Sequence, residues 1–151
     1  MVFKVNETNI VDAAKVYMES WKDSHKDICS SEFIKKHDLN YMLNFLKEKQ
    51  KQKYDIFIDY ISEKPVGIVG INSADEEICL LYVSPKEQGK GIGTKLLEFA
   101  LAKCRNPYIT VLDTNKKAID FYLKSGFVPA ENQPEQSKEK CIFERKYVYQ
   151  K

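Results

Sequence analysis

A glycine-rich turn joins a predicted strand to a predicted helix in the second half of the chain. Residues 78–83 form an apolar run, and apolar residues return at helical spacing from Ile92 to Cys104. Glycines in the intervening turn let the backbone approach a ligand closely, and the N–H groups that open a helix attract anions. The turn therefore predicts a phosphate-binding site, to which Lys90 and Lys95 would add positive charge.

The segments around this turn predict one α/β domain over residues 1–151. Strands are expected at residues 2–5, 55–61, 66–71, 78–83, 108–112, 127–128 and 141–149. Helices are expected from a cap at Thr8 or Asn9 through Trp21, from a cap at Asp38 through Leu46, and at residues 92–104 and 115–125, with a short helical turn at 31–36. Short turns join the three central strands into an antiparallel meander, and the later strand–helix–strand order predicts a parallel pair. We expect a single-domain mixed, mostly antiparallel sheet of about seven strands flanked by about four helices.

Composition and charge argue against several classes of partner. The 24 basic and 22 acidic residues are interspersed and leave a formal charge of +2, so no nucleic-acid partner is expected. The four cysteines form no C-x-x-C pair and have only two histidines as companions, so no metal site is expected. Free thiols, with no signal peptide and no membrane-spanning apolar run, predict a cytoplasmic protein without a membrane partner. The polar stretch 131–140 resembles a mobile loop.

Two familiar nucleotide-binding patterns fit the glycine turn poorly. A P-loop is excluded because no G-x-x-x-x-G-K-[ST] can be read through the segment. A dinucleotide-binding fold would explain the strand, the glycines, the helix and Asp113 about twenty positions further on. However, five residues separate Val83 from Gly89, where such a fold would turn at once, and the unit occurs once, late in the chain. A glycine turn that holds no ligand is the other alternative.

Two motifs at a suitable spacing resemble those of the GNAT acetyltransferases. The first is [QR]-x-x-G-x-[GA], which is satisfied by Gln88, Gly91 and Gly93. The second is carried by Asn115, Ala118, Phe121-Tyr122 and Gly126-Phe127. The resemblance covers nearly the whole chain and is weakest at residues 29–53 and after Pro129. It implies the acyl-CoA N-acyltransferase (GNAT) fold.

The resemblance implies that acetyl-coenzyme A binds as co-substrate in the gap between two diverging strands. The implied cofactor-binding residues are Leu81, Tyr82, Val83, Gln88, Gly89, Lys90, Gly91, Ile92, Gly93, Thr94, Asn115 and Tyr122. The N–H of Val83 would polarise the thioester carbonyl. Residues 88–94 would hold the pyrophosphate, and Asn115 would contact the lower part of the pantetheine arm.

Two catalytic roles also follow from the resemblance. A lysine-like amine is protonated at neutral pH and must lose a proton before it attacks the thioester. Glu77 matches the glutamate that serves some family members as general base, usually through water, although it also fits an exposed charge beside a turn. Tyr122 matches the tyrosine that protonates or stabilises the departing thiolate, and its alternative is a core aromatic residue.

The acceptor pocket is implied where the resemblance is weakest. Residues that resemble its wall in many small GNAT enzymes are Trp21, His25, Glu32 and Phe33. Trp21 and Phe33 would stack on the acceptor and Glu32 would meet a cation, although packing or solvent exposure also explains each residue. We expect acetyl transfer to a primary amine of a small molecule or peptide by direct attack in a ternary complex. The alternatives are a coenzyme A-binding sensor without catalysis and an enzyme that acetylates protein N-termini or lysines; a homodimer is implied by the resemblance alone.

If the glycine turn holds the pyrophosphate of coenzyme A, the coenzyme will raise the melting temperature. A ligand that binds the native state alone stabilises it by mass action. We expect a dose-dependent shift with coenzyme A or acetyl-coenzyme A in thermal denaturation, and a much smaller shift with NAD. A flat response at millimolar coenzyme, or an equal response to NAD, would contradict the assignment of the turn.

Overall fold

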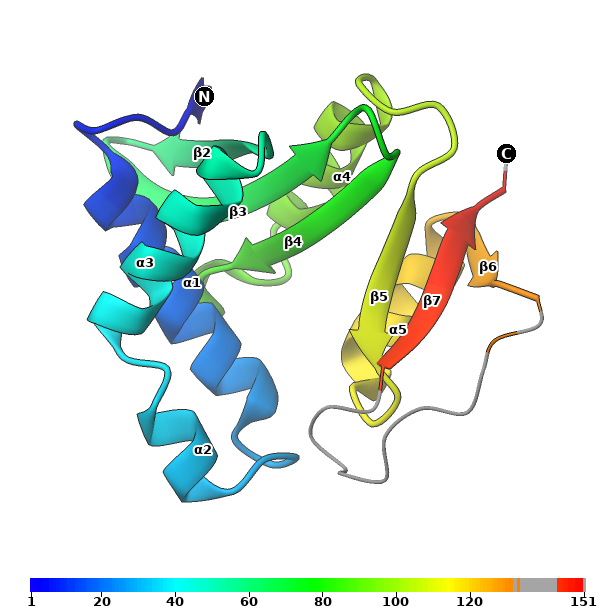
Figure 1. Cartoon of the computed structure of the whole chain (residues 1–151), viewed down its shortest axis with the longest axis horizontal. Helices are drawn as coiled ribbons and strands as arrows, with labels where there is room; N and C mark the ends of the chain where they lie inside the picture. Colours follow the sequence, from blue (N-terminus) through cyan, green and yellow to red (C-terminus); the bar gives the residue numbers. More distant parts are fainter. Residues whose placement is uncertain (132, 134–143, 151) are drawn as a thin grey trace.

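The computed structural model describes residues 1–131, 133 and 144–150 and contains a seven-stranded mixed sheet (Figure 1). Its strands are β1 (Val2–Lys4), β2 (Asp55–Ile61), β3 (Lys64–Asn72), β4 (Glu77–Val83), β5 (Tyr108–Leu112), β6 (Phe127–Pro129) and β7 (Glu144–Tyr149). They pair in the order β1-β2-β3-β4-β5-β7-β6, and among the described residues only β4 and β5 are parallel. The predicted sheet is confirmed, and the loop expected at 131–140 lies almost entirely outside the described residues.

Five α-helices of the described chain cover the faces of this sheet. They are α1 (Ile10–His25), α2 (Ser31–Lys35), α3 (Leu39–Lys51), α4 (Ile92–Leu101) and α5 (Lys116–Lys124), and the 3-10 helix η1 (Pro85–Glu87) precedes the glycine turn. The helix beyond the expected four is α2, which the sequence indicated only as a helical turn. None of these helices is both long and apolar enough to cross a membrane.

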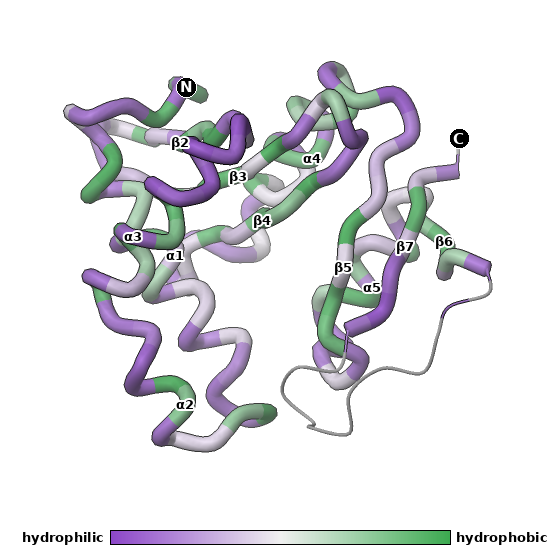
Figure 2. The backbone as a smooth tube through the Cα atoms, viewed as in Figure 1, coloured by the Kyte–Doolittle hydropathy of each residue, from purple (hydrophilic) through white to green (hydrophobic). Residues whose placement is uncertain are grey.

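Two hydrophobic clusters lie on opposite faces of the sheet. In one, α1 and α3 pack on the central strands, with Met42 and Leu46 fully buried against Ile68 of β3. In the other, α4 and α5 pack on the opposite face, with Leu96 and Phe127 at its centre. Figure 2 shows hydrophobic residues gathered along β3, β4 and α4, with hydrophilic ones along α2 and the outer turns. The sheet is thus a central layer between two layers of helices. Helices of both layers lie beside β4.

Side-chain hydrogen bonds explain where two helices begin. The Asp38 carboxylate accepts a bond from the Tyr41 N–H at 2.9 Å, which confirms the predicted cap of α3. The Asn115 side-chain oxygen accepts a bond from the Ala118 N–H at 3.3 Å at the start of α5. Asn9 occupies the cap position of α1 without such a bond. The start of α5 is therefore fixed by a local hydrogen bond.

Strands β4 and β5 diverge after a single residue pair. Glu77 pairs with Tyr108, and no further β4–β5 pair exists among the described residues. In contrast, β4 continues to pair with β3 as far as Val83, and β5 pairs with β7 along its whole length. The two halves of the sheet therefore separate as a wedge, visible between β4 and β5 in Figure 1. Along this wedge, the N–H and C=O groups of β4 that face β5 have no strand partner.

Helix α4, which follows the glycine turn, is fixed to the sheet by one ion pair and one close approach. Asp59 of β2 is fully buried, and both of its carboxylate oxygens accept bonds of 2.9 Å from the Lys95 ammonium group. Gly67 of β3 lies so close to α4 that a Cβ atom there would be 2.7 Å from Leu96 Cδ1 and 3.2 Å from the Tyr82 carbonyl oxygen. Glycine at 67 therefore sets the distance between α4 and the sheet.

Replacing Gly67 with alanine will destabilise the protein by about 1–3 kcal/mol, because the added methyl group overpacks the interface between β3 and α4. Chemical denaturation measures the loss. As a control, Leu96→Ala removes the clashing methyl group and itself destabilises the protein. The double variant must then lose less free energy of unfolding than the two single variants lose in sum. Additive losses would show that Leu96 does not oppose the new side chain.

Candidate active site

A cavity of about 450 Å³ runs along the glycine turn. Its walls come from the end of β4, the turn, the start of α4, the inner face of α5 and two serines of α1. The lining residues are Ser20, Ser24, Leu81, Tyr82, Val83, Glu87, Gln88, Gly89, Gly91, Ile92, Gly93, Thr94, Asn115, Lys117, Ala118, Phe121 and Tyr122. All residues that the sequence implied for cofactor binding are brought together here, except Lys90.

The backbone of the turn leaves open space and unpaired donors beside this cavity. Gly89 and Gly91 have φ angles of +80° and +83°, and a Cβ atom at either position would meet no protein atom within 4 Å. The first hydrogen bond inside α4 runs from the Lys95 N–H to the Gly91 carbonyl, so the three N–H groups before it have no intrahelical partner. A cradle of this kind fits a pyrophosphate group, because donors and the positive end of the helix dipole point at it.

The charges around the turn differ from those expected. Lys95 is bound to Asp59, so the expectation that its charge serves the phosphate site is wrong. Lys90 bonds Glu87 at 2.8 Å, and the hydrogen bonds from Lys90 and Lys64 lower the pKa of that carboxyl group. Lys117, which the sequence did not single out, lines the cavity and donates to Gln88 Oε1 at 2.7 Å. The cation beside the cavity therefore comes from α5, whose orientation no local pattern reveals.

A second cavity, of about 300 Å³, meets the first one at the wedge. Aromatic residues of α1, α2 and α3 line one side, and β5 lines the other. Residues that line both cavities are Leu81, Tyr82, Asn115, Ala118 and Tyr122. Two ligands that enter from the two cavities would therefore meet between the open edge of β4 and the inner face of α5.

Tyr122 lies at this junction. Its ring is 5 % exposed and packs edge-on against Phe121 and Phe127, with ring centroids 5.2 and 5.4 Å away. Its hydroxyl group has no hydrogen-bond partner among the described residues, yet no fully enclosed polar side-chain atom is without a partner. The hydroxyl is therefore open to the cavities. Burial raises the pKa of this phenol well above its usual value, so it remains protonated at physiological pH.

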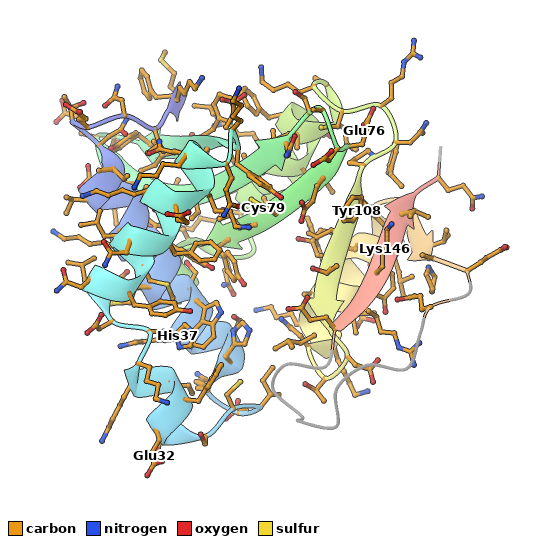
Figure 3. The ribbon with its side chains drawn as sticks, in the orientation of Figure 1. Glu32, His37, Glu76, Cys79, Tyr108 and Lys146 are labelled. Atoms are coloured by element: carbon orange, nitrogen blue, oxygen red, sulfur yellow. The ribbon has the colours of Figure 1, made fainter. Side chains whose placement is uncertain are left out.

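Glu77 lies where β4 and β5 meet and lines neither cavity. Its Oε1 atom accepts a hydrogen bond of 2.5 Å from the Tyr54 hydroxyl, and this bond raises the pKa of Tyr54. Figure 3 shows Glu76 and Tyr108 at the same closed end of the wedge. Because Tyr122 is further along the wedge, a role for Glu77 as general base requires intervening water and stays a prediction.

Three of the four predicted acceptor residues line the second cavity, and the fourth does not. Trp21, His25 and Phe33 line the second cavity. Glu32 is exposed on the outer side of α2 (Figure 3), so its expected contact with the acceptor is wrong. Stacking of Trp21 on the acceptor is also wrong, because two histidine rings cover the indole at centroid distances of 4.1 and 3.8 Å. Two imidazole rings at these distances from the indole would overlap each other if both lay on the same face of it. His25 and His37 must therefore cover opposite faces of Trp21.

Several residues of the second cavity were missed at the sequence level. They are Tyr17, His37, Tyr41, Phe45, Cys79 and Glu144. The signal was present in part, because His37 lies just before α3 and Tyr41 and Phe45 follow it at intervals of four residues within the helix. Burial raises the pKa of the Cys79 thiol to about 12. The thiol is thus protonated and a poor nucleophile, which favours direct transfer between two bound substrates over an acyl-cysteine intermediate.

Comparison with known proteins identifies the class to which this site belongs. Residues 13–127 match the Acetyltransferase (GNAT) family, and the chain belongs to this family. A thialysine N-epsilon-acetyltransferase from Sus scrofa is 45% identical over 51 residues, and the peptidyl-lysine N-acetyltransferase YjaB from Salmonella typhimurium is 34% identical over 65 residues. The chain spans 30% and 43% of the length of these two relatives. A spermine/spermidine N(1)-acetyltransferase from Bacillus subtilis is 24% identical over 81% of this chain and 73% of its own length.

Solved structures share the whole fold. PaiA N-acetyltransferase from Thermoplasma acidophilum, determined in complex with coenzyme A, has a TM-score of 0.76 with 20% identity, covering 100% of this chain and 98% of its own. The apo form of YjaB from Escherichia coli has a TM-score of 0.79 with 19% identity, covering 99% and 96%. The expected acyl-CoA N-acyltransferase fold is confirmed. Within the described residues, no group of three or more metal-ligating side chains is present.

Replacing Gly91 with alanine will weaken coenzyme A binding about tenfold or more. The left-handed backbone at this position resists a side chain, at a cost of about 1–2 kcal/mol, and the methyl group would project into the cavity. Gly93→Ala is the matched control, because a Cβ atom there has ordinary contacts of 3.6 Å and 3.7 Å with Phe121. Calorimetric titration of both variants should show affinity lost at 91 and retained within a few-fold at 93. Equal losses would contradict the cradle.

Proposed function

We propose that the protein is an acetyl-coenzyme A-dependent N-acetyltransferase that transfers the acetyl group directly to a primary amine. The proposal rests on the meeting of two cavities at the open edge of β4, beside the hydroxyl group of Tyr122, whose ring is buried. One cavity has the glycine cradle of a pyrophosphate site, and the other has aromatic walls. This arrangement supports a ternary complex in which both substrates are bound before chemistry occurs.

In this mechanism, acetyl-coenzyme A supplies an activated acetyl group as a thioester. The N–H groups at the start of α4 and the Lys117 ammonium group hold the pyrophosphate. The unpaired edge of β4 from Leu81 to Val83 aligns the pantetheine arm, and the Val83 N–H stabilises negative charge on the thioester oxygen. The chain's own backbone therefore provides most of the orientation on which direct attack depends.

Tyr122 acts on the departing thiolate. A thiol has an ordinary pKa of about 8.5, and burial raises the phenol pKa well above its ordinary value. The phenol is therefore a weaker acid than the thiol, so a hydrogen bond that stabilises the thiolate is its main contribution. Solvent then supplies the proton that converts the thiolate of coenzyme A to the thiol. The attacking amine loses its proton to water, and Glu77 accepts that proton through a water chain along the wedge.

The second cavity favours a cationic amine over an anionic acceptor. Glu144 is its one carboxylate among the described lining residues, and none of these residues is lysine or arginine. The relatives named above are named for thialysine, peptidyl-lysine and spermine or spermidine, all of which present aliphatic amines. We infer an aliphatic amine acceptor, and we place the enzyme in the cytoplasm, where the thiols of Cys79 and Cys104 remain reduced.

Replacing Tyr122 with phenylalanine will lower kcat by about a hundredfold to ten-thousandfold, while coenzyme A affinity changes less than a few-fold. The phenyl ring keeps the packing against Phe121 and Phe127, so a large effect must come from the hydroxyl group. A thiol-release assay with an aliphatic amine measures kcat, and calorimetry measures affinity.

Two outcomes would contradict this role. Normal turnover in the variant would make Tyr122 a packing residue, and joint loss of affinity and stability would make its hydroxyl structural. Wild-type protein that binds acetyl-coenzyme A but acetylates none of a panel of small amines and peptides would instead support a coenzyme A sensor.

A further inference from the structure

Two histidines enclose Trp21 at one end of the second cavity. His25 is parallel to the indole within 12° and His37 within 16°, with centroid distances of 4.1 and 3.8 Å. His25 belongs to the last turn of α1, whereas His37 lies between α2 and α3, so the stack joins separate segments. Figure 3 shows His37 on the same side of the wedge as Cys79, across from Tyr108 and Lys146.

Hydrogen bonds fix which nitrogen of each ring is available. His25 Nδ1 lies 2.7 Å from the Trp21 carbonyl oxygen, and His37 Nδ1 lies 2.8 Å from the Phe33 carbonyl oxygen. A carbonyl oxygen only accepts, so each Nδ1 carries the proton and donates it. In the neutral ring, Nε2 is then a hydrogen-bond acceptor. Burial lowers the pKa of His25, which keeps this ring neutral at neutral pH.

Both Nε2 atoms are unpartnered, although the rings are almost completely buried. His25 is 5 % exposed and His37 is 8 % exposed. Neither Nε2 atom has a hydrogen-bond partner in the described part of the chain, and no fully enclosed polar side-chain atom lacks one. Each Nε2 atom therefore keeps some exposure, and both rings line the second cavity.

Within the histidine pair, His25 lies further along α1 than the point where this helix packs on Tyr82. Tyr17 of α1 packs on Tyr82, which lines both cavities, at a centroid distance of 5.2 Å. His25 lies eight residues further along the same helix, which is about 12 Å at the rise of an α-helix. An acceptor that contacts both Tyr82 and the histidines must therefore be elongated.

We propose that His25 and His37 bind a second ammonium group of the acceptor, so that the preferred substrates are linear diamines or longer polyamines. The Nε2 acceptors of the two imidazole rings and the aromatic rings of Phe33 and Tyr41 suit an N–H-rich cation at this end of the cavity. A monoamine would leave both Nε2 atoms without a partner. This inference rests on the proposed N-acetyltransferase function for the other end of the same cavity.

Binding is tested first, without turnover. Trp21 is the single tryptophan of the chain and lies between the two histidines, so its fluorescence reports on this end of the cavity. With saturating coenzyme A present, cadaverine should produce a saturable change in Trp21 emission. Its Kd should be at least tenfold lower than that of pentylamine, which has the same carbon chain and one ammonium group. Equal or tighter binding of pentylamine overturns the proposal, because an apolar pocket alone favours the monoamine.

Three variants then assign the preference to the histidines. His25→Phe and His37→Phe keep a ring on Trp21 but remove the acceptor nitrogen, and each should lower kcat/KM for cadaverine at least tenfold while pentylamine changes less than about threefold. His37→Gln restores a neutral acceptor and should recover most of the cadaverine preference. A common loss for both amines, or an unchanged ratio, assigns the rings to packing and overturns the proposal.

Different results would contradict the proposed transferase function and the proposed second ammonium site. Acetylation of pentylamine and cadaverine at equal efficiency leaves the transferase function intact and removes the second ammonium site. Selective binding of cadaverine without acetyl transfer leaves the ammonium site intact and removes the transferase function. If a phenylalanine variant does not show the wild-type thermal shift with coenzyme A, the wild-type fluorescence comparison decides the question alone.

Discussion

The divergence of two parallel strands is the constraint on which the rest of this structure depends. β4 and β5 share one residue pair, Glu77 with Tyr108, and then separate while each keeps its other neighbour. A sheet that stayed closed would pair the backbone groups of β4 and leave no room for a ligand. Because it opens, the two cavities meet at Tyr122, and the edge of β4 between them is left unpaired.

An opening of this kind requires rigid walls. On one side, the ion pair of buried Asp59 with half-exposed Lys95 and the close approach at Gly67 hold α4 against the sheet, so the glycine turn has a fixed position. On the other side, the histidine–tryptophan stack joins α1 to the segment before α3. The position of the glycine turn matters because its N–H donors stabilise a phosphate only if they already point at it. Packing far from the chemistry therefore sets the geometry of the site.

Most of the fold, and most of the residues that line the first cavity, could be predicted from the sequence, because both depend on local patterns. Strand periodicity, the Asp38 cap and the glycine turn each act over a few residues. Lys95 was misassigned because its partner, Asp59, is 36 residues away on another strand. Trp21 was expected to stack on the acceptor, but His37, which follows a different helix, covers one of its faces. Lys117 and Glu144 were missed for the same reason: their positions depend on how α5 and β7 pack, which no motif encodes.

We propose that acetyl-coenzyme A and the amine approach each other through the opening between β4 and β5. The most direct test is a crystal structure with a bisubstrate analogue, in which coenzyme A is joined through an acetyl linker to an aliphatic amine. We expect the pyrophosphate at the start of α4, the linker beside Tyr122, and the amine chain in the aromatic cavity. An analogue whose amine chain lies outside that cavity, or whose pantetheine arm avoids the edge of β4, would contradict the account.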